Sequence, residues 1–147
     1  MPKEIIEKHR KIELCIDVMY INGVGLMTAI DRTIKYRSVE YVESKHASSH
    51  LKALSVIANQ YNKAGYYVYM VYCDREFKSL LQHAWEQLEI TINYTNTDDN
   101  VCEAKHNNRF LKEGFRTKFH YLPYKVMPRI MIKGLAIQVA RQANFFL

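Results

Sequence analysis

Hydrophobic and polar positions alternate along the first part of the chain. In residues 11–20 every even-numbered position is Ile, Leu, Val or Tyr, whereas the odd-numbered positions include Lys, Glu and Asp. This period of two predicts a β-strand. Asn22-Gly23 follows at once and an apolar run resumes at residues 24–30, which is the signature of a two-residue hairpin. A third extended segment is expected at residues 38–42, so the chain should open with three antiparallel strands.

The pattern changes to helical spacing in the next segment. Between residues 47 and 64 the apolar side chains recur at steps of three and four, and Gly65 stands where a helix would stop. The uninterrupted β-prone run at residues 66–73 predicts a strand that is buried on both faces. Four further elements are expected, namely a helix at 77–88, a strand at 90–94, a helix at about 101–119 and a last helix from 127 onward.

The resulting order, βββαβαβαα, predicts an α/β fold with a mixed sheet and helices on both faces. Consecutive elements tend to be neighbours and crossovers are right-handed, so the strand that ends at Asp74 should run parallel to the first strand and beside it. This would bring Asp74 close to Asp17. Because no repeat or Gly/Ser-rich linker interrupts the sequence, we expect one domain over residues 1–147, with residues 1–10 as a lead-in.

Composition narrows the class of protein. With 147 residues, 48% hydrophobic and 24% charged, the chain matches one globular domain and excludes a disordered, collagenous or coiled-coil protein. Its three cysteines form no C-x-x-C motif and its N-terminus is charged, so we expect an intracellular, reducing compartment. No apolar run approaches the roughly 18 residues of a membrane span. The formal net charge of +6 favours a polyanionic partner without specifying one.

Three carboxylates stand at positions that suit metal binding. Asp17 interrupts an apolar strand, and a charge buried there would need a partner, a metal or an opening. Asp74 follows the most apolar strand, and Glu103 lies in the first turn of a predicted helix. Taken singly, Asp17 is explained by a structural hydrogen bond, Glu103 by the helix dipole and Asp31 by a turn. Together, carboxylates from three elements can hold two hard divalent cations for phosphoryl displacement.

Three stretches of the sequence, IELCIDVMYINGVGLMTAIDRTIKY, VYCDREF and NTDDNVCEAKHNNRFLKEGFR, resemble the catalytic core of a retroviral-type integrase within the ribonuclease H-like superfamily. The closer resemblance is to the polyproteins of copia-type long-terminal-repeat retrotransposons. It implies a five-stranded sheet with three antiparallel strands followed by two parallel ones. It also implies a catalytic and metal-binding triad at Asp17, Asp74 and Glu103, with two Mg²⁺ or Mn²⁺ ions.

The same resemblance implies the activity and its setting. We expect a polynucleotidyl transferase and endonuclease that processes the DNA ends of a transposable element and joins them to a target duplex. Such enzymes work as homo-oligomers, in the nucleus and in cytoplasmic virus-like particles. The zinc-binding and C-terminal DNA-binding domains of integrases are not expected within this chain.

The sequence departs from the family pattern in two places. Only 28 residues separate Asp74 from Glu103, where many integrases have a longer loop. Asp98 and Asp99 compete for the role of third ligand, but we expect them in the loop before the helix and rank them below Glu103. Arg75 stands where a small or amide residue more often follows the aspartate, and it would either crowd the metals or pair with a substrate phosphate.

The helix after Glu103 carries a basic stripe at steps of four, three and four residues, formed by Lys105, Arg109, Lys112 and Arg116. In a DNA-joining enzyme this stripe would bind backbone phosphates, and otherwise it is a solvated helix face.

Other candidate chemistry is weaker. His46 and His50 are spaced as metal ligands, yet without an accompanying C-x-x-C motif we interpret them as exposed polar residues around a helix start. Cys73 and Cys102 are interpreted as packing residues.

Two alternatives to an active integrase remain. One is a chain that keeps the integrase fold as a DNA-binding module without catalysis. The other is a different ribonuclease H-like nuclease, which acts on an RNA–DNA hybrid.

Overall fold

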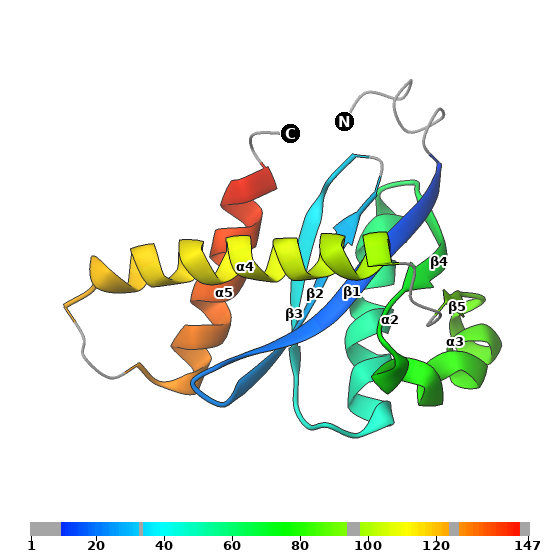
Figure 1. Cartoon of the computed structure of the whole chain (residues 1–147), viewed down its shortest axis with the longest axis horizontal. Coiled ribbons are helices and arrows are strands. Elements are labelled where there is room, and N and C mark those ends of the chain that lie inside the picture. Colours follow the sequence, from blue (N-terminus) through cyan, green and yellow to red (C-terminus); the bar gives the residue numbers. More distant parts are fainter. Residues whose placement is uncertain (1–9, 33, 94–97, 124–126, 145–147) are drawn as a thin grey trace.

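The computed structural model describes residues 10–32, 34–93, 98–123 and 127–144, so most of the expected lead-in lies outside the described residues. It is an α/β fold with one mixed five-stranded sheet in the spatial order β3-β2-β1-β4-β5 (Figure 1). The elements in chain order are β1 (Lys11–Ile21), β2 (Val24–Asp31), β3 (Arg37–Val42), α2 (Ala47–Lys63), β4 (Tyr67–Tyr72), the 3₁₀ helix η1 (Arg75–Leu80), α3 (Leu81–Leu88), β5 (Thr91–Asn93), α4 (Asp98–His120) and α5 (Arg129–Ala143). The expected order of elements is confirmed. So is the sheet, with three antiparallel strands followed by two parallel ones.

The hairpin between β1 and β2 forms as the Asn-Gly pair predicts. Asn22 has a φ of 50° and Gly23 a φ of 79°, which is the left-handed backbone that a two-residue turn of this type requires. The turn sets the register of the two strands, in which Asp17 lies opposite Thr28.

The start of α4 differs from the expectation. The helix begins at Asp98, so the placement of Asp98 and Asp99 in a loop is wrong. The helix thus starts three residues ahead of the predicted start, at two aspartates in the sequence, a residue type that is favourable in the first turn of a helix.

Strand β4 is not buried on both faces, contrary to the expectation. Val68 and Val71 are buried, whereas Tyr69 and Met70 are half-buried. The pairing of β1 with β4 shifts by one residue at Tyr69, as in a β-bulge. Both valines therefore face the same core, and the bulge, not burial on two sides, removes the alternation from the sequence.

The Tyr69 hydroxyl donates a hydrogen bond to the Glu13 carboxylate, which raises the pKa of Tyr69 to about 12.

Two hydrophobic cores lie on opposite faces of the sheet. Helix α2 buries Leu54 and Ile57 against one face. Helices α4 and α5 cover the other, and Figure 1 shows α4 running across the strands. The buried side of α4 includes Leu111 and Phe115. None of the described helices is long and apolar enough to cross a membrane.

His50 in α2 predicts a pH dependence of stability. Its ring lies 5.3 Å from that of Phe77, and burial lowers the pKa of His50 below its usual 6.5. Protonation is therefore easier in the unfolded chain, so the free energy of unfolding should fall as the pH falls below 6.5 towards the folded-state pKa. Urea unfolding between pH 7.5 and pH 5 measures this change.

The matched control for this effect is His46, which is exposed at the start of the same helix. We expect His50→Gln to reduce the loss of stability in acid and His46→Gln to leave it as in the wild type. Equal pH dependence in the two variants would show that His50 is not its source.

Candidate active site and nucleic-acid groove

The first two carboxylates of the predicted triad lie at the same end of neighbouring strands. Strands β1 and β4 are parallel, with Cys15 opposite Tyr72 in the register. Two residues further along each chain come Asp17 and Asp74. Because side chains alternate between the two faces of a sheet, Asp17 lies on the same face as Cys15, which comes two residues before it. Asp74 likewise comes two residues after Tyr72, the strand partner of Cys15. The expectation that these strands are parallel neighbours is therefore confirmed.

The chain is held where it leaves β4. The backbone N–H of Phe77 donates a hydrogen bond to the carbonyl of Asp74 at 3.1 Å, which begins η1 directly after the aspartate. Phe77 is fully buried. A core side chain thus anchors the turn that carries Asp74.

The carboxylate of Asp17 takes part in a network that links β1, β2 and α4. Its Oδ1 accepts from the N–H of Val18 at 2.8 Å, and its Oδ2 accepts from Nδ2 of Asn108 at 2.9 Å. The Thr28 hydroxyl donates to Oδ1 of Asn108. Since hydrogen bonds to an ionised group are stronger than neutral ones, Asn108 orients the carboxylate and Thr28 orients Asn108.

Sequence reasoning did not identify Asn108 or Thr28. A signal for Asn108 was present, because it lies four residues after Ala104 and three before Leu111, and both of these are buried. An amide within the apolar stripe of a helix needs a polar partner. No comparable signal marked Thr28, which lies within a strand that is buried throughout.

Glu103 lies in the part of α4 that passes over these strands. Ala104, the next residue, packs in a small cluster with Cys15 and Ile30, and Tyr72 contacts this cluster. The side chain of Glu103 lies outside those described, so its role as third ligand stays a prediction. The side chains of Arg75, Asp98, Asp99 and Cys102 lie outside them as well.

The remaining sequence candidates show no metal site. Among the side chains that the structure describes, no three of the His, Cys, Asp and Glu type lie close enough to hold an ion. His46 is exposed, as expected, but the expectation that His50 is exposed is wrong, because its ring is half-buried against Phe77. Cys73 is buried in the core beneath α2, which agrees with its interpretation as a packing residue.

A groove of about 660 Å³ runs between β1 and α4, and Asp17 lies in its wall. All four residues of the predicted basic stripe line this groove, namely Lys105, Arg109, Lys112 and Arg116. Arg109 contacts Glu113, one turn further on, at 3.4 Å, but both side chains are exposed and such a pair contributes little. The stripe therefore faces the same space as the Asp17 carboxylate.

The sequence was also compared with known proteins. No protein-family model matches it, and no curated protein shows a significant match.

Proposed function

We propose that this chain is the catalytic core of a retroviral-type integrase with a ribonuclease H-like fold. It would act as a metal-dependent polynucleotidyl transferase that processes retroelement DNA ends and joins them to a target duplex, as a homo-oligomer. One observation carries the proposal. Asp17 and Asp74 share one end of two parallel strands, under a helix that contains Glu103 and turns a basic stripe towards Asp17.

The donor chemistry of the site suits Mg²⁺ or Mn²⁺, because both ions prefer oxygen ligands. Asp17 and Asp74 supply carboxylate oxygens, and Glu103 is proposed as the third ligand. Two such ions, when bound, activate a water or a DNA 3′-hydroxyl and stabilise the leaving oxygen.

The residues of the chain itself orient and position the substrate. Asn108 holds the Asp17 carboxylate in one orientation through its amide N–H. The basic stripe neutralises backbone phosphates and keeps a strand in the groove without reading its bases. Since Asn108 and the stripe belong to the same helix, the strand and the carboxylate are positioned by one rigid element.

The test is nicking and strand transfer on oligonucleotides with Mn²⁺. The double variant Asp17→Asn/Asp74→Asn should lose both activities, and activity that survives in it would contradict the assignment. An RNA–DNA hybrid of the same sequence serves as the competing substrate. Preference for the hybrid over duplex DNA would favour the alternative nuclease.

The groove also supports a second candidate function, a DNA-binding module without catalysis. Four cationic side chains line the groove against two carboxylates, Asp17 and Glu113, and this charge does not depend on a metal. Binding of duplex DNA in EDTA, together with no cation binding by calorimetry, would favour this module over the transferase.

The stripe predicts how binding responds to salt. For duplex DNA the slope of log K against log salt changes by about 0.9 for each phosphate contact. Lys105→Ala/Arg116→Ala should therefore reduce the slope by about 1.8, measured by fluorescence anisotropy in EDTA. Lys63→Ala, on the exposed side of α2, is the control and should keep the wild-type slope. Equal slopes in all three proteins would mean that the groove does not hold the phosphates.

A further inference from the structure

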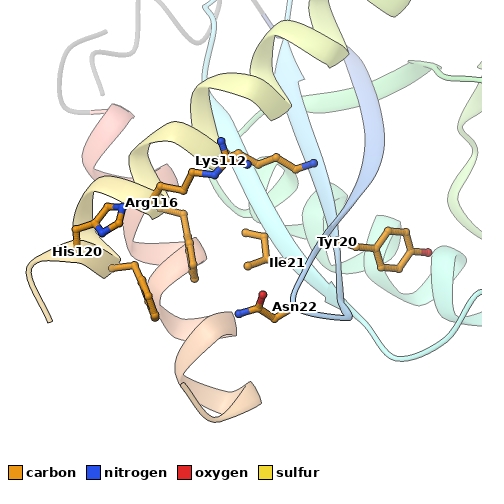
Figure 2. Close-up of a pocket in the computed structure, with 8 residues that line it drawn as sticks. Tyr20, Ile21, Asn22, Lys112, Arg116 and His120 are labelled. Atoms are coloured by element: carbon orange, nitrogen blue, oxygen red, sulfur yellow. The ribbon is translucent and has the colours of Figure 1, made fainter. Parts of the chain in front are cut away.

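A second pocket continues the groove at the β1–β2 turn. It has a volume of about 400 Å³ and lies between this turn and the last turns of α4. Figure 2 shows Lys112, Arg116 and His120 on α4, across from Ile21 and Asn22 at the turn. The groove and the pocket share Tyr20 and two of these cations, Lys112 and Arg116, so the two spaces are contiguous.

The lining combines an aromatic surface with groups that bind phosphate. Phe115 and Phe119 contribute rings that are nearly parallel, with centroids 6.3 Å apart and planes 12° apart. Phe115 is buried, whereas Phe119 is half-buried and leaves part of its ring accessible. Lys112 and Arg116 supply positive charge, and no carboxylate belongs to the described lining. The pocket therefore favours a ligand with a flat apolar part and an anionic part.

The distance along α4 fits a strand that also passes Asp17. Asn108, which contacts Asp17, and Phe119 are separated by 11 residues, a rise of about 16 Å in a helix. At about 3.4 Å per nucleotide of a stacked strand, this corresponds to roughly five nucleotides. One strand can thus place a phosphate at the carboxylate and a base at the pocket.

We propose that this pocket binds one unpaired base of the nucleic-acid strand that lies in the groove. The base contacts the ring of Phe119, while Lys112 and Arg116 bind the flanking phosphates. The proposal rests on the proposed function only in that a strand occupies the groove. It adds a preference for a single-stranded or frayed end, because a paired base must first lose its pairing and stacking in the duplex before it can enter the pocket.

The test compares two labelled 12-nucleotide strands by fluorescence anisotropy in EDTA. One strand carries bases and the other carries an abasic sugar at every position, so both have the same phosphate charge. Stacking of one base on an aromatic ring predicts at least roughly fivefold tighter binding of the intact strand by the wild-type protein. Equal affinity for the two strands would overturn the proposal, whatever the variants do.

Two variants on the same helix locate the base. Phe119→Leu keeps an apolar side chain but removes the ring, and it should abolish the preference for the intact strand. Phe110→Leu is the matched control, since Phe110 is 47% exposed and lies outside the pocket. It should retain the full preference. Loss of the preference in Phe110→Leu, or its survival in Phe119→Leu, would overturn the proposal.

A third variant separates phosphate contacts from base contacts. Asn22→Asp adds a carboxylate at the pocket, and Asp-Gly is compatible with the same turn. It should weaken binding of both strands by a similar factor.

A mononucleotide that competes as well as the 12-nucleotide strand would indicate a site for free nucleotides and overturn the strand proposal. These binding assays contain EDTA and do not depend on a metal, whereas the nicking assay contains Mn²⁺. A failure of nicking therefore contradicts the proposed function and leaves the base-binding proposal unaffected.

Discussion

Replacing Asp17 by Asn is expected to slow Mn²⁺-dependent nicking by about 1,000-fold or more. Metal ions contribute several kcal/mol of charge stabilisation in phosphoryl transfer, and each 1.36 kcal/mol is a factor of about ten in rate. An amide is a poor ligand for these ions in place of a carboxylate. Single-turnover nicking of a labelled duplex measures the change, and calorimetric titration with Mn²⁺ should show weaker binding.

The fold should survive this replacement. The asparagine side chain in the Asp17→Asn variant would still accept a hydrogen bond through its one oxygen, but it cannot accept from both Val18 and Asn108 as the carboxylate does. We expect a loss of about 1 kcal/mol in the free energy of unfolding. This is small beside the roughly 5–15 kcal/mol of a typical domain.

Glu113→Gln is the matched control, since Glu113 lines the same groove and is exposed. It should nick at close to the wild-type rate. A loss of activity as large in Glu113→Gln as in Asp17→Asn would point to the charge of the groove, and would argue against Asp17 as a metal ligand.

Phe77→Ala is expected to lower the free energy of unfolding by about 3–5 kcal/mol. The side chain of Phe77 is 0% exposed and among the largest that are fully buried, and it packs in the core beneath α2. Its removal leaves a cavity that the surrounding helices cannot fill completely. Urea unfolding at pH 7 measures the loss.

The control for this cavity is Trp85→Ala in α3, the helix that follows η1. Trp85 is 61% exposed, so its removal should change the free energy of unfolding by less than about 1 kcal/mol. A similar cost for both aromatic residues would contradict the assignment of Phe77 to the core.

Phe77→Ala should also affect the site at temperatures where the variant is still folded. The N–H of residue 77 holds the carbonyl of Asp74, and the buried ring fixes that turn in place. A looser turn would misplace Asp74 relative to Asp17, so the nicking rate should fall more in Phe77→Ala than in Trp85→Ala.

The sequence by itself determined the order of elements and the neighbourhood of two aspartates. Alternation in β1, the Asn22-Gly23 turn and the helical spacing in α2 are local patterns, because each depends on residues a few positions apart. The parallel arrangement of β1 and β4 was expected from the helical crossover that precedes β4, together with the rules that crossovers are right-handed and that consecutive elements tend to be neighbours. That Asp17 and Asp74 lie at the same end of two neighbouring parallel strands was therefore predictable from local patterns and chain connectivity.

Only the tertiary structure decided what surrounds them. The bulge at Tyr69, the partners of the Asp17 carboxylate and the pocket beside Asn22 depend on how elements pack, and local periodicity does not encode such packing. Asn108 reaches Asp17 across 91 positions of sequence, a contact set by the angle at which α4 crosses the sheet. The spacing of hydrophobic residues identifies which face of a helix or strand is buried. Which side chains that face contacts depends on the whole fold.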